Sequence, residues 1–317
     1  MTQAPSTERF LVTGALGCIG AWVVKRLLDE GAHAVVYDLG TGDHRLRLVL
    51  DDDQLASLVR IPGDITSLAQ LEQALDEHEI TNVIHLAALQ IPFCRDNPPL
   101  GAAVNVVGTV NVFDAVKRRR DRIGNVVYAS SAAVYGPART SGTAPESVLE
   151  WPGTHYGVYK IANEGTARIY WQENELPSIG LRPYVVYGPG RDQGVTSSPT
   201  AAMEAAARGE GSHIPFGGRT QFHYAPDVAD AFIAASRSAY SGALVANLPA
   251  PAVHMQDVVD AIAAVAPDTA ITFDDVQLPF PEELQAEALV AAIGPVPVTP
   301  LREGVAATIE HFRTRDG

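Results

Sequence analysis

The order of apolar and polar residues along the chain predicts strands that alternate with helices. Between stretches where apolar residues recur at helical spacing, as in residues 21–28, lie short apolar runs typical of buried parallel strands. These runs cover residues 10–13, 34–38, 58–62, 83–86, 126–129 and 179–182. The alternation predicts an α/β fold, a doubly wound, Rossmann-like parallel sheet with helices on both faces and ligands at the carboxyl ends of its strands.

The pattern weakens after Pro183, where proline and glycine become frequent. We expect that region to form a smaller C-terminal cap over the main domain. Residues 244–248 form a further apolar run, which we expect to return to the main sheet. The predicted main domain therefore comprises residues 1–182 and 223–249, and the predicted cap comprises residues 183–222 and 250–317.

Three glycines, Gly14, Gly17 and Gly20, separate the first predicted strand from the first predicted helix. Glycines at such a turn allow a sharp bend and the close approach of a pyrophosphate to the helix N-terminus. The spacing Gly-x-x-Gly-x-x-Gly differs from the commoner Gly-x-Gly-x-x-Gly. A glycine-rich turn without a ligand is the alternative, and the motifs downstream disfavour it.

The second predicted strand ends in Asp38. A carboxylate at this position accepts hydrogen bonds from the adenosine ribose and repels a 2′-phosphate, so the sequence predicts NAD rather than NADP. Arg45 lies nearby in the sequence and is the alternative determinant, because a guanidinium would favour the phosphate.

Tyr156 and Lys160 are four residues apart, which places them one turn apart on one face of a helix. A tyrosine with its ordinary pKa of about 10 needs its anion stabilised before it can act as a base near neutral pH. Lowering that pKa by about three units corresponds to about 4 kcal/mol, within reach of a neighbouring ammonium and a cationic nicotinamide ring. The pair alone is a weak signal, and it gains weight from the motifs that precede it.

Together these motifs resemble the extended short-chain dehydrogenase/reductase family, also called the NAD-dependent epimerase/dehydratase family. The resemblance covers nearly the whole chain. It is carried by the glycine turn, by the tyrosine–lysine pair, and by residues 63–66, 85–88, 105–111, 127–136, 181–190 and 222–229.

The resemblance implies catalytic roles for Ser131, Tyr156 and Lys160. Tyr156 would exchange the substrate hydroxyl proton, Lys160 would bind the nicotinamide ribose and lower the Tyr156 pKa, and Ser131 would bind the reacting oxygen. Of the pair Ser130–Ser131, the second is in the family's catalytic register. The implied NAD contacts are Gly14, Gly17, Cys18, Ile19, Gly20, Asp38, Asp64, Ile65, Leu86, Ala87, Ala88, Asn105, Tyr156, Lys160, Pro183 and Val185.

Departures from the family pattern bear on the substrate. Ala132 and Ala133 stand where dehydratases carry an acidic pair, so assisted elimination of water is not expected. Val186, Thr220 and residues 278–281 stand where nucleotide-sugar members place polar anchors that grip a diphosphate. Arg191 and Arg219 remain available for such a role.

The sequence therefore predicts a small polyhydroxylated alcohol or ketone as substrate, namely a free sugar, a sugar acid or a hydroxy acid. The candidate contacts are Gln90, Cys94, Ser131, His155, Tyr184, Arg191 and His223. Each of the six besides Ser131 is open to the alternative of a packing or surface residue. Arg95 or Arg191 is a candidate partner for a substrate carboxylate.

Three functions remain open at this point. The first is an NAD-dependent dehydrogenase with net turnover of the cofactor. The second is a sugar or nucleotide-sugar epimerase that keeps NAD bound, since it would use the same three catalytic residues. The third is a non-catalytic NAD-binding module, which a broken catalytic set would favour, and here the set is intact.

Charge and composition narrow the expected partners. A net charge of −14 argues against nucleic acid and anionic membranes. Two cysteines do not suggest a disulfide scaffold, and no His/Cys cluster has metal-ligand spacing, so no metal is expected. No apolar run is expected to span a membrane and no signal segment is visible, which favours the cytoplasm.

The resemblance also implies a homodimer held by a four-helix bundle. The helices concerned are those around residues 105–116 and from Tyr156 onward. The second carries a broad stripe of apolar and small residues at helical spacing, wider than one sheet-facing side needs.

Overall fold

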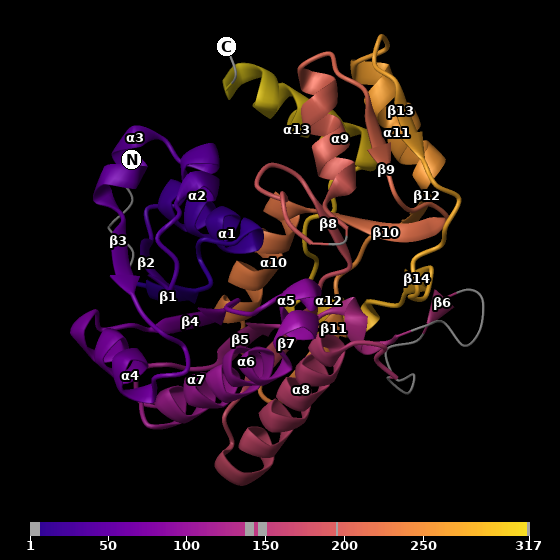
Figure 1. Ribbon diagram of the computed structural model, residues 1–317. Coiled ribbons are helices and arrows are strands. Elements are labelled where there is room, and N and C mark those ends of the chain that lie inside the picture. Colours follow the sequence, from indigo (N-terminus) through magenta and orange to yellow (C-terminus); the bar gives the residue numbers. More distant parts are fainter. Residues whose placement is uncertain (1–6, 137–142, 145–150, 195, 316–317) are drawn as a thin grey trace.

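The computed structural model describes residues 7–136, 143–144, 151–194 and 196–315. Its chain forms a large sheet layered with helices and a smaller part built around helices α9, α11 and α13 (Figure 1). The smaller part lies over one end of the sheet. This is the α/β arrangement predicted from the alternation of strands and helices.

Seven parallel strands form the main sheet in the order β11-β7-β5-β4-β1-β2-β3. Each strand that was predicted from an apolar run is present, with ends within one residue of the prediction. The strands are β1 (Arg9–Thr13), β2 (His33–Asp38), β3 (Val59–Pro62), β4 (Asn82–His85), β5 (Val126–Ala129), β7 (Ser178–Arg182) and β11 (Ala243–Asn247). The strand order reverses between β1 and β4, and ligands of open α/β sheets bind at such a switch point.

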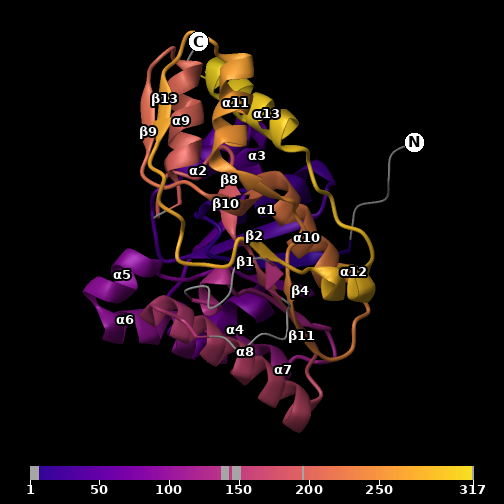
Figure 2. The same cartoon turned by 90° about the vertical axis from the view of Figure 1, so that its right-hand side faces the viewer.

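Two layers of helices cover the sheet. One layer contains α1 (Cys18–Asp29), α2 (His44–Val49) and α10 (Ala225–Arg237), and the other contains α4 (Leu68–Glu77), α7 (Gly108–Lys117) and α8 (His155–Asn174). Figure 2 shows α4, α7 and α8 together on one side of the sheet. The short helices α3 (Asp52–Ser57), α5 (Ile91–Asp96) and α6 (Pro98–Ala102) lie in the connections.

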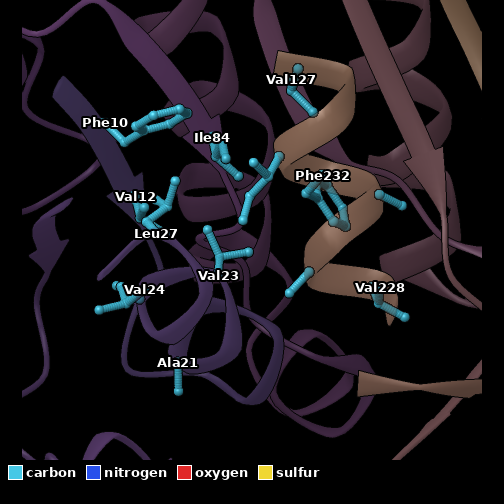
Figure 3. Close-up of a cluster of buried hydrophobic side chains, with 14 of the residues drawn as sticks. Phe10, Val12, Ala21, Val23, Val24, Leu27, Ile84, Val127, Val228 and Phe232 are labelled. Atoms are coloured by element: carbon cyan, nitrogen blue, oxygen red, sulfur yellow. The ribbon is translucent and has the colours of Figure 1, made fainter. Parts of the chain in front are cut away.

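The core of the first layer forms between the strands and the helices α1 and α10. Figure 3 shows Phe10, Val12, Ile84 and Val127 from the strands facing Val23 and Leu27 of α1 and Val228 and Phe232 of α10. All eight side chains are buried. At about 25 cal/mol per Å² of apolar surface, this contact is a main source of the free energy of folding.

Helices α6 and α7 are joined by a π-helical turn, η1 (Ala103–Val107), into one run from Pro98 to Lys117. Within the described residues this run alone is long and apolar enough, at a mean hydropathy of 1.3, to meet the criteria for a membrane span. No such run was expected from the sequence. Its apolar character has a structural explanation, because Val112 and Phe113 pack in the core between the sheet and its helices.

The cap is built on a three-stranded sheet, β12-β10-β8. Its strands are β8 (Val185–Tyr187), β10 (Arg219–Tyr224) and β12 (Ala252–His254), with η2 (Ala132–Val134), a 3-10 turn, close to its base. Two further strand pairs join β9 (Ser212–Ile214) to β13 (Ile271–Phe273) and β6 (Thr143–Ala144) to β14 (Glu283–Leu284). Helices α9 (Ser198–Ala207), α11 (Met255–Val265) and α13 (Leu301–Arg315) enclose a separate core that contains Met203, Ile262 and Ile309.

Helix α12 (Glu287–Ile293) departs from the predicted domain division. Its Leu289 is fully buried in the same core as α1 and α10, and the helix contacts β11. The predicted cap segment 250–317 is therefore not cap throughout, because its apolar residues at 288–293 find their partners on the main domain.

Candidate active site

The turn between β1 and α1 requires glycine at two positions. Gly14 has a φ of +68°, and a Cβ there would lie 2.5 Å from the amide nitrogen of Ala87. A Cβ at Gly20 would lie 2.5 Å from the carbonyl oxygen of Gly14. Only glycine allows the turn, the loop after β4 and the helix to approach so closely.

The N-terminus of α1 offers unpaired amide donors. Gly17 is the N-cap, no side chain caps the helix, and its first turn contains no acidic residue. Such an end, with the positive pole of the helix dipole, fits the pyrophosphate of a dinucleotide. Cys18 and Ile19 open the helix at this point, and burial raises the pKa of the Cys18 thiol to about 12.

Asp38 and Arg45, the two charged groups that bear on the choice between NAD and NADP, have different partners in the structure. Asp38, at the end of β2, accepts hydrogen bonds from the amides of Leu16 (3.1 Å) and Gly40 (3.0 Å). The Arg45 guanidinium is bound to the Asp192 carboxylate through Nε (2.9 Å) and Nη2 (2.6 Å) and to the Leu16 carbonyl (3.0 Å). Because Arg45 is already paired, the geometry favours the prediction from Asp38.

Asp64 and Ile65 form a rigid turn after β3. The Asp64 carboxylate accepts hydrogen bonds from the amide (2.9 Å) and hydroxyl (2.8 Å) of Thr66. Ile65 is buried against Gly108, where a Cβ would lie 2.7 Å from its side chain. This turn lies beside the end of β2, on the adenosine side of the predicted cofactor site.

A buried chain of hydrogen bonds fixes the loop after β4. Thr109 donates to the Asn105 carbonyl (2.7 Å), so its oxygen accepts from His85 Nε2 (3.0 Å), and His85 Nδ1 accepts from Thr13 (2.7 Å). The Thr13 oxygen in turn accepts from the amides of Leu86 and Ala87. Burial lowers the pKa of His85 to about 3, so this imidazole stays neutral and acts as a structural link.

The π-helical turn η1 places Asn105 against the end of the same loop. Its side chain accepts from the Leu89 amide (2.7 Å) and donates to the Leu89 carbonyl (2.9 Å). Single π-helical turns within α-helices occur often at functional sites. Here the turn holds the loop from Leu86 through Ala88 to Leu89 at the cofactor side of the sheet.

The three predicted catalytic residues come together at the ends of β5 and α8. Ser131 follows β5, accepts from the Ala133 amide (3.1 Å) and is hydrogen-bonded to Tyr156. Lys160 is buried and donates to the Ala129 carbonyl (2.6 Å), with its Nζ 5.4 Å from the centre of the Tyr156 ring.

Opposing effects act on the pKa values of Tyr156 and Lys160. Burial raises the pKa of Tyr156, while the hydrogen bond with Ser131 and the charge of Arg191 act to lower it. Burial lowers the pKa of Lys160 to about 8, while Cys94 and Glu164 act to raise it. The phenol is therefore neutral in this setting, and the cationic nicotinamide of bound NAD would add the positive charge that favours its anion.

Pro183 and Val185 begin the segment that leads from β7 into the cap. The Pro183 carbonyl accepts from the Ala132 amide (3.0 Å). This bond joins the start of the cap to the loop after β5 that carries Ser130 and Ser131, here called the serine loop. Val185 is fully buried in β8. The segment thus links the serine loop, through Pro183, to the core of the cap, through Val185.

Two of the predicted substrate contacts lie together near Tyr156. The Arg191 guanidinium acts on the Tyr156 pKa, and its Nη2 donates to Thr196 (3.1 Å). Its Nε is buried and has no hydrogen-bond partner among the described residues. Gln90 lies beside it, since a Cβ at Gly194 would be 2.5 Å from Gln90 Oε1 and 3.1 Å from Arg191 Nη2. Tyr156, Arg191 and Gln90 thus converge on one region.

Two other predicted substrate contacts form hydrogen bonds to backbone groups. Cys94 is fully buried and its thiol donates to the Leu89 carbonyl (3.1 Å). His223 accepts from the Tyr184 amide (3.0 Å) and donates to the Leu248 carbonyl (3.1 Å), and burial lowers its pKa to about 4. We therefore leave Cys94 and His223 out of the substrate contacts that we propose.

Tyr184 and His155 are the two remaining candidates. The Tyr184 hydroxyl donates to the Pro281 carbonyl (2.8 Å), and its ring meets Phe280 edge to face at 5.9 Å. His155 is exposed and stacks on Tyr159 at 6.1 Å.

Sequence reasoning missed a buried ion pair beside the trio. Glu164 of α8 binds Arg182 at the end of β7 through two hydrogen bonds of 2.8 and 2.6 Å. Arg182 and Tyr135 fall within recognised motifs but received no role, and Glu164 was not singled out. The available signal was an acidic residue four positions after Lys160 together with an arginine ending a buried strand. Within the described part of the chain, no group of three His, Cys, Asp or Glu side chains could hold a metal ion.

The sequence matches the model of the NAD dependent epimerase/dehydratase family over residues 10–246. It is 31% identical to the UDP-glucose 4-epimerase of Mycolicibacterium smegmatis over 322 residues, which cover 97% of this chain and 99% of that protein. The residues matched by the family model include the glycine turn and the Ser131–Tyr156–Lys160 set.

Solved structures show the same fold. MoeE5 in complex with UDP-glucuronic acid and NAD is 30% identical, with a TM-score of 0.79 and coverage of 97% of this chain and 99% of that one. The UDP-glucose 4-epimerase of Thermus thermophilus in complex with NAD is 26% identical, with a TM-score of 0.80 and coverage of 96% and 99%. The L-threonine dehydrogenase of Clostridium difficile, at 19% identity and a TM-score of 0.83 with coverage of 97% and 98%, is similar in fold alone.

Proposed function

Because this chain belongs to the NAD-dependent epimerase/dehydratase family, we propose that it is a dehydrogenase acting on a secondary alcohol or ketone of a small polyhydroxylated acid. It is an NAD-dependent enzyme of the extended short-chain dehydrogenase/reductase type. When bound, NAD accepts or supplies the hydride, and the glycine turn and Asp38 fit its pyrophosphate and ribose.

The protein's own groups handle the proton and the orientation. In oxidation Tyr156 takes the proton of the substrate hydroxyl, and in reduction it returns one to the carbonyl oxygen. Ser131 holds that oxygen close to the tyrosine. The Lys160 ammonium, one helical turn away, stabilises the tyrosinate form.

The observation that carries the choice of an acidic substrate is Arg191. Its Nε is buried with no partner in the part of the chain that the structure describes, and a buried guanidinium atom without a partner is costly. The neighbouring carboxylate, Asp192, is paired with Arg45 instead. A substrate carboxylate beside the reacting carbon would satisfy the guanidinium and orient the substrate toward Tyr156.

The residues of the cap favour a small substrate and disfavour a nucleotide sugar with its diphosphate. Val186 and Thr220, where nucleotide-sugar members have polar anchors, are buried. Arg219 points elsewhere, with its guanidinium on the Ala252 carbonyl (3.1 Å) and 3.9 Å from Glu282. The contact of Tyr184 with Phe280 makes an apolar wall at the remaining position.

An epimerase that acts on a nucleotide sugar is the second candidate. It is favoured by the full-length similarity to the UDP-glucose 4-epimerase of Mycolicibacterium smegmatis and to MoeE5. The intact Ser131–Tyr156–Lys160 set disfavours a non-catalytic NAD-binding module.

A substrate screen tests the proposal. Sugar acids, hydroxy acids, free sugars, UDP-glucose and UDP-glucuronic acid are each incubated with NAD, and both reduced-cofactor absorbance and sugar products are followed. We expect the absorbance to rise with acids, and Arg191→Met to raise KM for the acid while Arg168→Met, on the exposed face of α8, leaves it unchanged. Interconversion of a UDP-sugar with no net reduced cofactor would overturn the proposal in favour of the epimerase.

We also propose that the chain forms a homodimer through α7 and α8. Val158 and Ile169 of α8 are 49% and 40% exposed, and Leu100 and Val107 of the neighbouring run are each 49% exposed. Figure 2 shows these helices side by side at the edge of the molecule. A second copy would cover these apolar side chains, as in many two-fold dimers.

A further inference from the structure

A buried polar network lies behind the catalytic trio. Its centre is the ion pair of Glu164 and Arg182, whose side chains are 10% and 4% exposed. Ser130, the residue before the catalytic serine, is hydrogen-bonded through its hydroxyl to Glu164 Oε1. Glu164 of α8 is therefore joined to β7 through Arg182 and to the serine loop through Ser130.

The network continues toward the cap. Arg182 donates to the Tyr135 hydroxyl (2.6 Å), and its guanidinium lies 4.9 Å from the centre of the Tyr135 ring. Tyr135 donates to Asn247 at the end of β11 (3.0 Å), and Asn247 donates to the Gln285 carbonyl (2.7 Å). Figure 1 shows the ends of β7, β11 and α8 meeting near β14.

We propose that Glu164 is a positioning residue for catalysis, which holds the Tyr156–Lys160 helix against the serine loop. Two features of the geometry carry this inference. Glu164 lies one helical turn beyond Lys160, and it joins α8 to Ser130, the neighbour of Ser131. The inference rests on the acid–base roles of Tyr156 and Lys160 in the proposed function, but not on which substrate they serve.

Glu164 also bears on the charge of Lys160. Its ammonium donates to the Ala129 carbonyl of β5, and the groups around it are the Cys94 thiol of α5, the neutral His85 of β4 and Tyr156 on its own helix. Burial lowers the Lys160 pKa, while Cys94 and, to a smaller extent, Glu164 raise it, and Glu164 is the carboxylate of the two. Removing that charge leaves burial to favour the neutral amine.

The experiment uses the small number of lysines. The sequence has three, Lys25, Lys117 and Lys160, so ¹³Cε-labelled lysine in the NAD-saturated protein gives a readily assigned NMR titration. Lys160→Met assigns the signal, and Lys25 and Lys117 serve as internal controls. This readout needs no substrate, so it can fail or succeed independently of the proposed function.

For Glu164→Gln we expect the Lys160 titration to move down by about one pH unit. With a substrate from the screen above, we expect kcat to fall about 10- to 100-fold while KM for NAD changes little, because the trio is misplaced rather than lost. Glu164→Asp should restore the Lys160 titration. Asp230→Asn, which breaks the Arg26–Asp230 pair on the opposite helical layer, is the matched control and should change neither quantity.

An unchanged Lys160 titration in Glu164→Gln, with kcat like that of the control, would overturn the inference and leave Glu164 with a purely structural role. If Glu164→Gln does not fold, Tyr135→Phe is the second variant. It removes the hydroxyl between Arg182 and Asn247 and keeps the charges of Glu164 and Arg182. There we expect kcat to fall and the Lys160 titration to stay in place, and wild-type kcat would overturn the positioning role.

Discussion

Tyr156 and Lys160 share one helix, but the roles proposed for them depend on side chains from other elements. Ser131 comes from the loop after β5, and Arg191 comes from the segment after β8. Burial raises the pKa of Tyr156, so in its proposed role as a base the tyrosine would depend on Ser131, Arg191 and the nicotinamide to favour its anion. A mutation at any of these positions should therefore affect turnover before it affects the fold.

Tyr156→Phe is the direct test of the proton carrier. The ring volume is kept and the titrating hydroxyl is lost, so we expect turnover to fall roughly 100- to 10,000-fold with NAD binding retained. Steady-state kinetics and NAD titration measure the two effects. Tyr159→Phe, which loses only a hydrogen bond to the Pro98 carbonyl, is the control. Turnover like that of the wild type in Tyr156→Phe would remove this residue from the mechanism.

Asp38→Ala tests the choice of cofactor. The substitution removes the ribose acceptor and the repulsion of a 2′-phosphate together, so the ratio of kcat/KM for NAD to that for NADP should fall. Asp43→Ala, which removes an acid bound to Arg47 and Arg60 nearby, should leave the ratio unchanged. A wild type that already prefers NADP would show that Asp38 has been misinterpreted.

At the scale of elements, the glycine turn and α1 act as one unit with the loop after β4. Gly20→Ala would place a methyl group 2.5 Å from the Gly14 carbonyl, so the turn must open. We expect a loss of about 1–3 kcal/mol in the free energy of unfolding and weaker NAD binding. Chemical denaturation and NAD titration measure both, with Gly124→Ala as control because nothing lies within 4 Å of its Cβ. An unchanged NAD affinity would contradict this account of the turn.

The elements of the main domain could be predicted from the sequence because their signals are local. Parallel strands buried on both faces appear as short apolar runs, and the glycine spacing marks the turn between β1 and α1. The family and its NAD dependence follow from motifs of this kind and are confirmed by the comparisons.

Other features depend on contacts that no local pattern contains. The π-helical turn η1 is set by the bonds between Asn105 and Leu89. Helix α12 meets β11 and the core shared by α1 and α10 only after the chain has folded. Glu164 looks like a solvated helix charge until Arg182 is placed beside it. The roles of Cys94 and His223 depended on which way each side chain turned, which spacing does not determine.

At the scale of the whole molecule, the proposed dimer would place α8 between the catalytic site and a second subunit. Ile169→Lys puts a charge into the proposed interface, and we expect the protein to shift from dimer to monomer with some loss of activity. Light scattering at micromolar concentration measures the mass. Val276→Lys, at a side chain 60% exposed in the cap, is the control. A wild type that is monomeric under these conditions would contradict the proposal.

The packing of α10 against α1 has a consequence for how the chain reaches its native state. The strands from β1 to β7 are complete by Arg182, yet their apolar face is covered by Phe232 and Val228, and β11 is added at residues 243–247 (Figure 3). Such contacts between distant parts of the chain slow folding and leave partly made chains exposed to aggregation. We therefore expect a fragment ending at Arg182 to stay loosely packed and bind a hydrophobic dye, so that during synthesis the nucleotide-binding unit gains its stability only once about four-fifths of the protein has left the ribosome.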